Sequence, residues 1–316
     1  MPDPRLNAVY SSRSMTRRYE VWFLRCGLAN GSGAWWFRYL LMNLGRAARS
    51  AENAKMPVQV WATWFPRDAQ PQTFIQGFPT DQLDLSPRHQ LPFRFKVADN
   101  AIDENSCRGN LSVNGHSISW NLRNHSNFGV TLSNKGWIGF SKSPHSDAIF
   151  SGEINFDGQR FSADPLGFGV QGHNCGYRHR TFWRWMHAYF PQPEGSATTL
   201  EALIYDLPFG FLFRKAVLWH KGTATTFKNL RESEIVHREE HLKWAFVANR
   251  GDLSFNAAIE ASDAGIHRLP YIRTNCSGSF PVSNASLAQA TIRILAKNRD
   301  ESLQTLSGAV LEMGGS

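Results

Sequence analysis

The sequence predicts an all-β protein, organised as two tandem antiparallel β-domains of the barrel or sandwich type. Segments that alternate between apolar and polar side chains, and that are rich in β-branched and aromatic residues, recur along the 316 residues. Turn signals such as VNGHS, FDGQ and ANRGD separate many of these segments. Segments with helical periodicity are scarce, and one short helix is expected near 43–54. Short strands joined by hairpin turns are typical of antiparallel sandwiches and barrels.

The expected strands divide into two groups at a segment rich in Pro, Gly, Ser and Thr over 191–199. We therefore expect a flexible N-terminus over 1–18, a first domain over 19–190, a linker over 191–199 and a second domain over 200–316. The strands themselves are expected at 19–26, 35–44, 58–65, 93–98, 109–115, 117–122, 148–156, 183–190, 200–207, 211–219, 243–249, 253–261, 289–295 and 308–313.

The composition of the chain does not identify a binding partner. The net charge of +8 comes largely from dispersed arginines, which is compatible with an anionic ligand, a membrane surface or RNA and selects none of them. No apolar core of signal-peptide length begins the chain, and no stretch approaches the roughly 20 apolar residues that span a bilayer. We expect a cytoplasmic location, with peripheral contact to a membrane left open, and the oligomeric state is not predicted.

The cysteines are widely spaced, and no C-x-x-C motif occurs. A zinc ribbon or a thioredoxin-type site is therefore not expected. Reduced thiols are the default for a cytoplasmic chain, although two disulfides stay open. The four cysteines are Cys26, Cys107, Cys175 and Cys276.

The stretch QGHNCGYRHRTFWRWMHAYF over 171–190 carries the densest chemistry. It is expected to begin as a glycine-broken turn and to end as a strand. A metal site is not expected, because zinc ligands are usually paired more tightly and often include a carboxylate, although a site built from His173 and Cys175 is conceivable. Strand alternation places Trp183, Trp185 and His187 on one face, which favours a pocket wall or a core over a nucleic-acid surface. Pocket wall and core stay open as alternatives.

Several parts of the chain resemble the lipocalin-like superfamily of carotenoid 1,2-hydratases, tocopherol cyclases and Diels–Alderases. The turn 172–176 (GHNCG) followed by 183–185 (WRW) is similar to that family's His-Asn turn and W-x-W element. The opening strand 20–25 (EVWFLR) is similar to the E-x-W-Y-F-R entry strand of the tocopherol-cyclase-like members. The closing strand 308–313 (GAVLEM) is similar to the G-x-x-x-E end of the family's second barrel. The segments 109–123 and 151–161 look like hairpins of its first barrel.

The resemblance implies two lipocalin-like domains with a hydrophobic cavity between or within them, and a cofactor-independent reaction on an isoprenoid, polyene or polyketide-like substrate. Family members protonate an alkene or hold a chain ready for cyclisation. The chain departs from the family motif at two positions. Gly172 stands where the hydratase motif has an Asp, and Cys175 stands where it has a Trp.

Three residues are the catalytic candidates. Glu20 shares a strand face with Trp22, and a carboxyl in an apolar cavity has a raised pKa and can donate a proton. The alternative is that Glu20 forms an ion pair with Arg38 or another arginine in a solvated position. His173 can change charge near neutral pH, and Asn174 can hydrogen-bond a carbonyl oxygen.

The remaining site candidates are expected to bind a hydrophobic small molecule. Arginines here could anchor a polar head group, and aromatic rings could enclose an apolar body or stabilise a carbocation. A non-catalytic carrier and a structural β-protein with an entirely packed core are the competing hypotheses. The substrate-binding candidates are Trp22, Arg178, Trp183, Trp185 and His187, with Arg180 as a second anchor.

Overall fold

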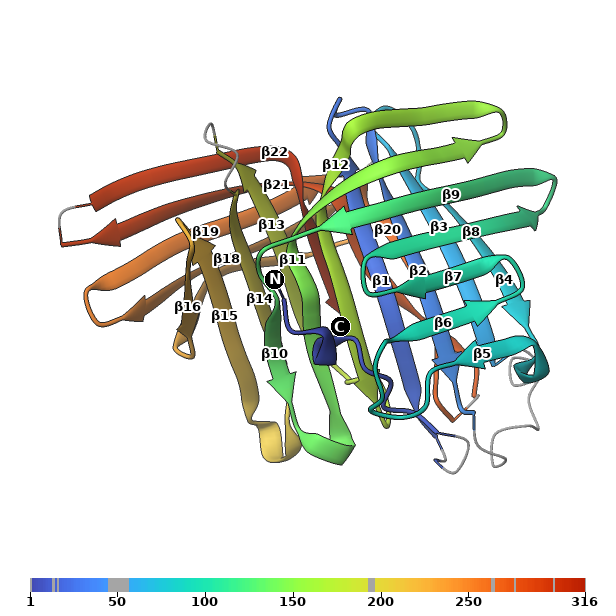
Figure 1. Ribbon diagram of the computed structural model, residues 1–316. Coiled ribbons are helices and arrows are strands. Elements are labelled where there is room, and N and C mark those ends of the chain that lie inside the picture. Colours follow the sequence, from blue (N-terminus) through green and yellow to red (C-terminus); the bar gives the residue numbers. More distant parts are fainter. Residues whose placement is uncertain are drawn as a thin grey trace.

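The computed structural model describes residues 2–12, 15, 17–44, 57–192, 197–262, 265–275, 277–297 and 299–315. Within these residues the chain forms strands and short 3-10 turns, and the strands make two antiparallel sheets that lie against each other (Figure 1). The prediction of an all-β protein is therefore confirmed. The helix expected near 43–54 falls almost entirely outside the described residues. No helix within the described parts has the length and apolar character needed to cross a bilayer.

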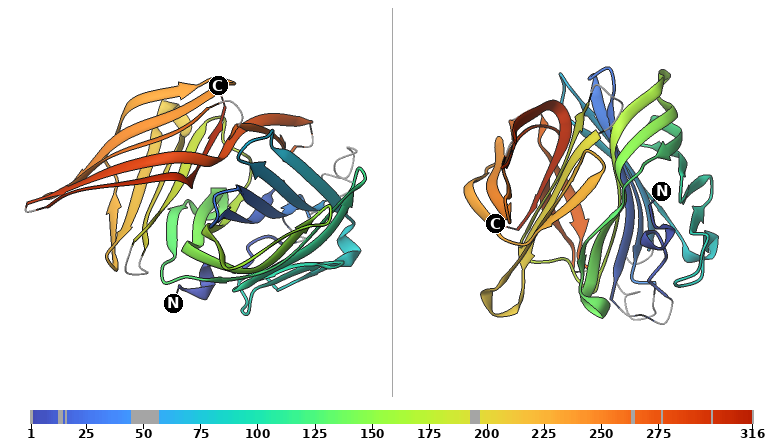
Figure 2. Two further views of the ribbon diagram at one scale, coloured as in Figure 1. Left: turned by 90° about the horizontal axis from the view of Figure 1, so that it is seen from above. Right: turned by 60° about the vertical axis from the view of Figure 1, so that its left-hand side comes forward.

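The first sheet curls into a nearly closed barrel. Its strands run in the order β4-β3-β2-β1-β12-β11-β9-β8-β7-β6-β5, with β10 paired to β11, and β4 comes back into contact with β8 (Figure 2). The strands are β1 (Tyr19–Leu28), β2 (Gly33–Met42), β3 (Val58–Pro66), β4 (Gln72–Phe78), β5 (Leu83–Leu85), β6 (Arg94–Val97), β7 (Asn100–Asp103), β8 (Ser106–Val113), β9 (His116–His125), β10 (Val130–Asn134), β11 (Gly139–Phe156) and β12 (Gln159–Gly176).

The second sheet follows the order β16-β15-β14-β13-β22-β21-β19-β18-β17, with β20 paired to β21. Its strands are β13 (Trp183–Pro191), β14 (Ala197–Asp206), β15 (Leu212–His220), β16 (Thr223–Phe227), β17 (Leu230–His237), β18 (His241–Arg250), β19 (Leu253–Ser262), β20 (His267–Ile272), β21 (Ser279–Ala296) and β22 (Arg299–Gly314). The 3-10 turns are η1 (Pro4–Leu6), η4 (Thr80–Gln82), η5 (Gly136–Ile138) and η6 (Pro208–Gly210).

The chain changes sheets earlier than the sequence predicted. Strand β13 pairs with β14 and β22, so the change falls between Gly176 and Trp183 and not at 191–199. The expected turn at 172–176 is also wrong, because these residues are the end of β12 and pair with β1. Glycines occur there because the partner strand is crowded: an added Cβ at Gly172 would lie 2.1 Å from the Phe23 ring, and one at Gly176 would lie 2.8 Å from the Tyr19 ring.

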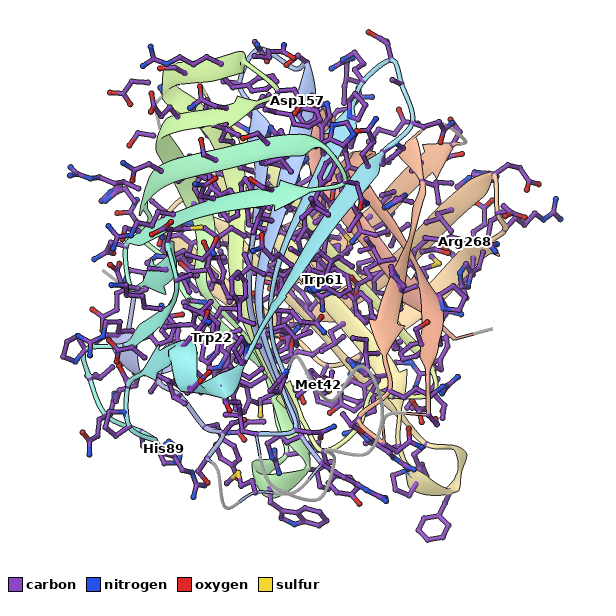
Figure 3. The ribbon with its side chains drawn as sticks, turned by 90° about the vertical axis from the view of Figure 1, so that its right-hand side faces the viewer. Trp22, Met42, Trp61, His89, Asp157 and Arg268 are labelled. Carbon is purple, nitrogen blue, oxygen red and sulfur yellow. The ribbon has the colours of Figure 1, made fainter. Side chains whose placement is uncertain are left out.

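The apolar side chains form three separate layers. One fills the barrel of the first sheet, one covers the inner face of the second sheet, and the third lies between the two sheets. Strands β1, β2 and β14 border the middle layer and are therefore buried on both faces. Figure 3 shows the distinction, with Trp22 inside the first sheet and Trp61 near the second.

The described part of the N-terminal segment is packed, although the sequence predicted a flexible end over 1–18. Asn7, Val9 and Ser11 are buried, and the Asn7 carbonyl accepts a hydrogen bond from Trp22 Nε1 at 3.1 Å. An apolar Val9 in the first core is the physical reason, because its burial holds the segment across the first sheet.

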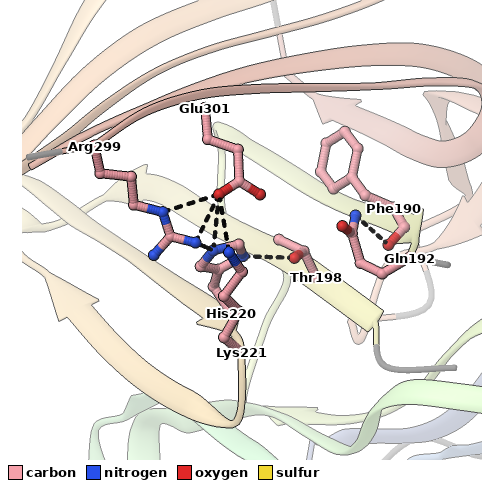
Figure 4. A network of polar contacts seen from close by, with 7 residues as sticks. All are labelled: Phe190, Gln192, Thr198, His220, Lys221, Arg299 and Glu301. Carbon is pink, nitrogen blue, oxygen red and sulfur yellow. Dashed lines mark hydrogen bonds and ion pairs between the residues drawn. The ribbon is translucent and has the colours of Figure 1, made fainter. Parts of the chain in front are cut away.

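A polar network joins three strands of the second sheet, β14, β15 and β22 (Figure 4). His220 Nδ1 and Thr198 Oγ1 share a hydrogen bond of 2.6 Å, and the His220 ring also contacts Arg299. The Glu301 carboxylate accepts from Arg299 Nε at 2.9 Å and from Lys221 Nζ at 3.4 Å. Burial and the neighbouring Arg299 lower the pKa of His220, so the imidazole is neutral at pH 7. The network links β14, β15 and β22 and lies apart from the cavity described below.

The three described cysteines, Cys26, Cys107 and Cys175, are buried free thiols. Burial raises the pKa of Cys26 and Cys107 to about 12, so neither is a thiolate at neutral pH. Cys276 lies outside the described residues.

Candidate functional site

A cavity of about 110 Å³ lies between the two sheets, within the middle apolar layer. Aromatic rings make most of its wall, and a small set of charged and polar groups projects into it. The residues that line it are Tyr19, Val21, Phe23, Trp36, Arg38, Ser133, Ile138, Gly139, Phe140, Ser141, Asn174, Cys175, Gly176, Arg178, His179, Arg180, Trp183, Trp185, Leu203, Tyr205, Tyr271 and Glu312.

Strand alternation decides which side chains of β1 reach the cavity. Tyr19, Val21 and Phe23 line it, whereas Glu20 and Trp22 point the other way, into the barrel of the first sheet. The sequence correctly placed Glu20 and Trp22 on one face. It did not reveal that this face belongs to the packed barrel, because both faces of β1 are buried.

Glu20 and His173 form a buried pair, and both side chains are fully inaccessible to solvent. Glu20 Oε1 lies 2.9 Å from His173 Nε2 and accepts from Tyr10 N at 2.8 Å, while Oε2 accepts from Ser11 N at 2.6 Å. His173 Nδ1 donates to the Leu6 carbonyl at 2.7 Å. Every oxygen of the carboxylate and both ring nitrogens are therefore occupied within the protein.

These contacts overturn the prediction that Glu20 has a raised pKa. Burial on its own would raise it, but the hydrogen bonds from His173, Ser11 and Tyr10 and the charge of His173 outweigh burial and lower the pKa. Glu20 is therefore an ionised carboxylate at neutral pH and is a poor proton donor. The alternative partner Arg38 is also wrong, because Arg38 points into the cavity between the sheets.

Five of the predicted residues do line the cavity: Asn174, Arg178, Arg180, Trp183 and Trp185. His187 lies deeper between the sheets, where its Nε2 donates to the Ser146 carbonyl at 2.6 Å. Burial lowers the pKa of His187 to about 3, so its imidazole is neutral. The structure thus divides the predicted set between the cavity wall and buried positions behind it.

Arg38 is one of the cavity residues that the sequence analysis did not assign to a site. Its side chain is 4% exposed, and its guanidinium stacks 4.1 Å from the Tyr271 ring centre and 4.6 Å from that of Trp61. No carboxylate in the described residues forms an ion pair with it, and its Nη1 has no hydrogen-bond partner there. A buried guanidinium with a vacant donor is costly, so it is suited to an oxygen acceptor supplied by a ligand.

Glu312 faces the same cavity and holds three donors. Its Oε1 accepts from Trp183 Nε1 at 3.0 Å, and its Oε2 accepts from Tyr271 OH at 2.7 Å and from Asn284 Nδ2 at 3.3 Å. Because Tyr271 contacts both Arg38 and Glu312, one ring sets the positions of a cation and a carboxylate. Burial raises the pKa of Tyr271 well above 10, so its hydroxyl stays protonated.

Two further polar atoms of the cavity wall have no partner among the described residues. They are Trp36 Nε1, a donor, and Asn174 Oδ1, an acceptor. Buried polar atoms are almost always hydrogen-bonded. Together with Arg38 Nη1, they indicate that the cavity is built to receive a molecule with both acceptor and donor groups.

His179 closes one side of the cavity as a neutral ring. It stacks on Tyr19 with ring centres 4.1 Å apart, and its pKa is lowered to about 3 by burial and by the charge of Arg38. An imidazolium at this position would repel Arg38. His179 is therefore part of the aromatic wall and does not donate a proton at neutral pH.

Glu201 lies behind Trp185 as a second buried carboxyl. Oε1 accepts from Ser143 Oγ at 2.6 Å and from Trp185 Nε1 at 2.9 Å, and Oε2 accepts from Ser146 Oγ at 3.2 Å. Burial raises the pKa of Glu201 to about 7 and outweighs these hydrogen bonds. In the unfolded chain the group ionises near pH 4.5.

The E201Q variant is expected to gain stability relative to the native protein as pH rises. Between pH 4.5 and 7 the folded state holds a proton that the unfolded state has lost, so the free energy of unfolding of the native protein falls with rising pH. E201Q lacks this dependence. The difference should grow by on the order of 3 kcal/mol from pH 4.5 to 8. Chemical denaturation across this range measures it, and an E153Q variant at an exposed site is the control. A pH-independent difference would contradict the assignment.

Comparison with known proteins identifies the fold. No family model and no curated protein matches the sequence. Among solved structures, kievitone hydratase from Nectria haematococca aligns over 100% of this chain and 95% of its own, with a TM-score of 0.58 and 10% identity. CghA aligns over 95% of this chain and 88% of its own, with a TM-score of 0.61 and 8% identity. An AttH-type protein from Nitrosomonas europaea aligns over 95% and 93%, with a TM-score of 0.56 and 11% identity.

This chain shares the fold of these neighbours over nearly its whole length, so the lipocalin-like fold implied by the resemblance is confirmed. Identities of 8 to 11% establish the fold alone. One departure from the family motif has a structural cause. The ring of Phe23 occupies the space that an acidic side chain at Gly172 would need.

Proposed function

We propose that this protein is an enzyme of the hydratase or cyclase type, acting on a hydrophobic isoprenoid or polyketide-like substrate bound between the two sheets. The observation that carries the proposal is the pairing of Arg38 and Glu312 around Tyr271 in an aromatic cavity. A vacant guanidinium donor and a carboxylate within one small space are the two groups that addition to an activated double bond requires.

In the proposed reaction, Arg38 Nη1 donates a hydrogen bond to a carbonyl or enolate oxygen and stabilises the negative charge that develops there. Glu312 transfers a proton to or from the substrate or water. Hydration adds the H and OH of water across a double bond, and cyclisation rearranges bonds within one molecule. Both are redox-neutral, so no redox cofactor is needed for the electrons to balance.

The aromatic wall has a separate role in this proposal. Trp36, Trp183 and Trp185 enclose the apolar body of the substrate, while Trp36 Nε1 and Asn174 Oδ1 bind its polar groups. The space of about 110 Å³ is smaller than the roughly 300–1,000 Å³ of drug-sized pockets. A larger ligand would therefore bind with part of its length outside, past Arg178 at the rim.

The test separates an enzyme from a carrier. Native mass spectrometry and turnover assays with prenylated phenols, enones and polyenes should find at least one compound that binds and is converted. The E312Q variant should bind it with similar affinity and convert it at least about 100-fold more slowly. If E312Q converted the compound as fast as the native protein does, Glu312 would have no role in proton transfer. Binding without conversion would make the protein a carrier, and failure of every compound to bind would reject the site.

A further inference from the structure

Two loops of the protein carry large apolar side chains that are exposed to solvent. The first is the turn at 136–138 between β10 and β11, where Trp137 is 68% exposed and Ile138 is 39% exposed. The second is the turn at 208–211 between β14 and β15, where Phe209 is 96% exposed and Phe211 is 68% exposed. We call these two turns the aromatic tips. Both lie at the lower end of the molecule in Figure 1.

The aromatic tips are neighbours although about 70 residues of sequence separate them. Ser133 Oγ and Tyr205 OH are 2.6 Å apart, and Lys135 Nζ lies 5.5 Å from the centre of the Phe213 ring. The segment 177–182 joins them, because Tyr177 N donates to the Ile138 carbonyl at 3.0 Å and Phe182 N donates to Asp206 at 3.0 Å. The two strand pairs that carry the tips therefore lie side by side, and both tips project from the same end of the molecule.

The backbone at Phe209 adopts a conformation that is unfavourable for phenylalanine, so stability does not explain why this residue occupies the turn. Phe209 has φ 63° and ψ 26°, in the left-handed region that favours glycine and that bulky residues rarely occupy. A phenylalanine there strains the backbone and places an apolar ring in water. Glycine or asparagine would satisfy the turn better. A residue that costs stability twice is a candidate for function.

The charge around the aromatic tips is positive. The segments 130–144, 176–182 and 205–216 contain six basic residues and one acidic residue, Asp206, whose carboxylate accepts hydrogen bonds from Thr181 and Phe182. Protruding Trp and Phe flanked by Lys and Arg are the combination that enters a membrane interface and attracts anionic headgroups. The basic residues are Lys135, Lys142, Arg178, Arg180, Arg214 and Lys215.

We propose that the aromatic tips dock the protein onto the surface of a bilayer that contains anionic lipids. Trp137, Phe209 and Phe211 insert among the headgroups, and the surrounding basic residues contact the anionic lipids. Because Ile138 also lines the cavity, docking places the cavity beside the apolar phase. An oily substrate could then enter without crossing water. This last consequence rests on the proposed function, whereas docking itself does not.

Sedimentation of the full chain with vesicles tests the proposal. The native protein should bind phosphatidylcholine vesicles containing 30% phosphatidylglycerol, about tenfold or more better than phosphatidylcholine alone at low salt. The W137S/F209S/F211S variant should lose about tenfold or more of its partition to the anionic vesicles. L306S is the matched control, because Leu306 is 67% exposed on β22, outside the tips, and this variant should bind like the native protein.

Two further variants separate charge from insertion and function from fold. K135E/R214E should weaken binding to the vesicles that contain phosphatidylglycerol and leave binding to pure phosphatidylcholine vesicles unchanged. F209G should raise Tm and weaken vesicle binding together, which a structural role for the ring would not produce. Binding by the triple variant equal to that of the native protein, or no vesicle binding at all, would overturn the proposal. So would a dimer in solution that the triple variant dissociates. If the assays found no substrate, the proposed function would fail, but the native protein should still bind the anionic vesicles and the triple variant should still lose this binding.

Discussion

Replacing Arg38 with methionine is expected to abolish the function of the cavity and to stabilise the fold. The substitution removes a buried charge that has no ion pair in the described residues, which should raise the free energy of unfolding by about 1–3 kcal/mol. It also removes the donor for a substrate oxygen, which should lower turnover and ligand affinity about 100-fold or more. Calorimetry or denaturation measures the first effect, and steady-state kinetics or ligand titration measures the second.

Arg25 provides a control for the Arg38 prediction, because it is also a buried arginine between the sheets. Its guanidinium donates to the carbonyls of Phe168, Ser286, Ser307 and Ala309, so it links the two sheets through satisfied hydrogen bonds. R25M should therefore destabilise the protein by roughly 3–5 kcal/mol, since it leaves these carbonyls without donors. If R38M destabilised the protein as R25M does, Arg38 would have a structural role and the proposed site would lose its main support.

Replacing Glu20 with glutamine is expected to destabilise the protein without slowing the chemistry of the folded molecule. The amide keeps one acceptor oxygen and gains an NH2 donor in place of the other, so it cannot accept all the hydrogen bonds that Tyr10, Ser11 and His173 direct at the two carboxylate oxygens. We expect a loss of about 2–4 kcal/mol in the free energy of unfolding at pH 7. Because the pKa of Glu20 is lowered in the folded state, this contribution is present above pH 4.5 and disappears as pH falls through the folded pKa.

The comparison between E20Q and E312Q distinguishes the two carboxylates. Turnover per folded molecule should be close to native in E20Q and strongly reduced in E312Q. Denaturation curves taken at pH 7 and pH 3 should show the E20Q deficit shrinking at the lower pH. Full stability of E20Q with lost turnover would restore Glu20 as the catalytic acid and would contradict the reading of the structure.

Part of the candidate site could be recognised in the sequence. The W-x-W element gave Trp183 and Trp185, and alternation along 183–190 correctly set these rings apart from Met186, Ala188 and Phe190, which pack into the second sheet. A stronger signal was passed over at Arg38, a single charge within the apolar strand WWFRYLLM. Charged residues are rarely fully buried without a partner, so a lone arginine in such a strand marks a position of interest.

Other members of the site carried a weaker signal. Glu312 lies in the closing strand that resembles the family's G-x-x-x-E ending, but its partners come from elsewhere in the chain. Tyr271 lies on β20, which the sequence did not predict as a strand. Arg38 and Tyr271 are brought together by the packing of one sheet on the other, and no local pattern reports a contact between segments more than 200 residues apart.

The sequence by itself determined that this chain forms antiparallel sheets, and it determined which alternate residues of β1 and β13 share a face, because a strand repeats every two residues. Only the tertiary structure decided where each face lies. Glu20 and Trp22 entered a packed barrel and Tyr19, Val21 and Phe23 entered the cavity, although both faces of β1 are apolar and buried. The physical reason is that the hydrophobic effect is non-directional. The burial of an apolar strand face stabilises the fold whichever apolar surface packs against that face.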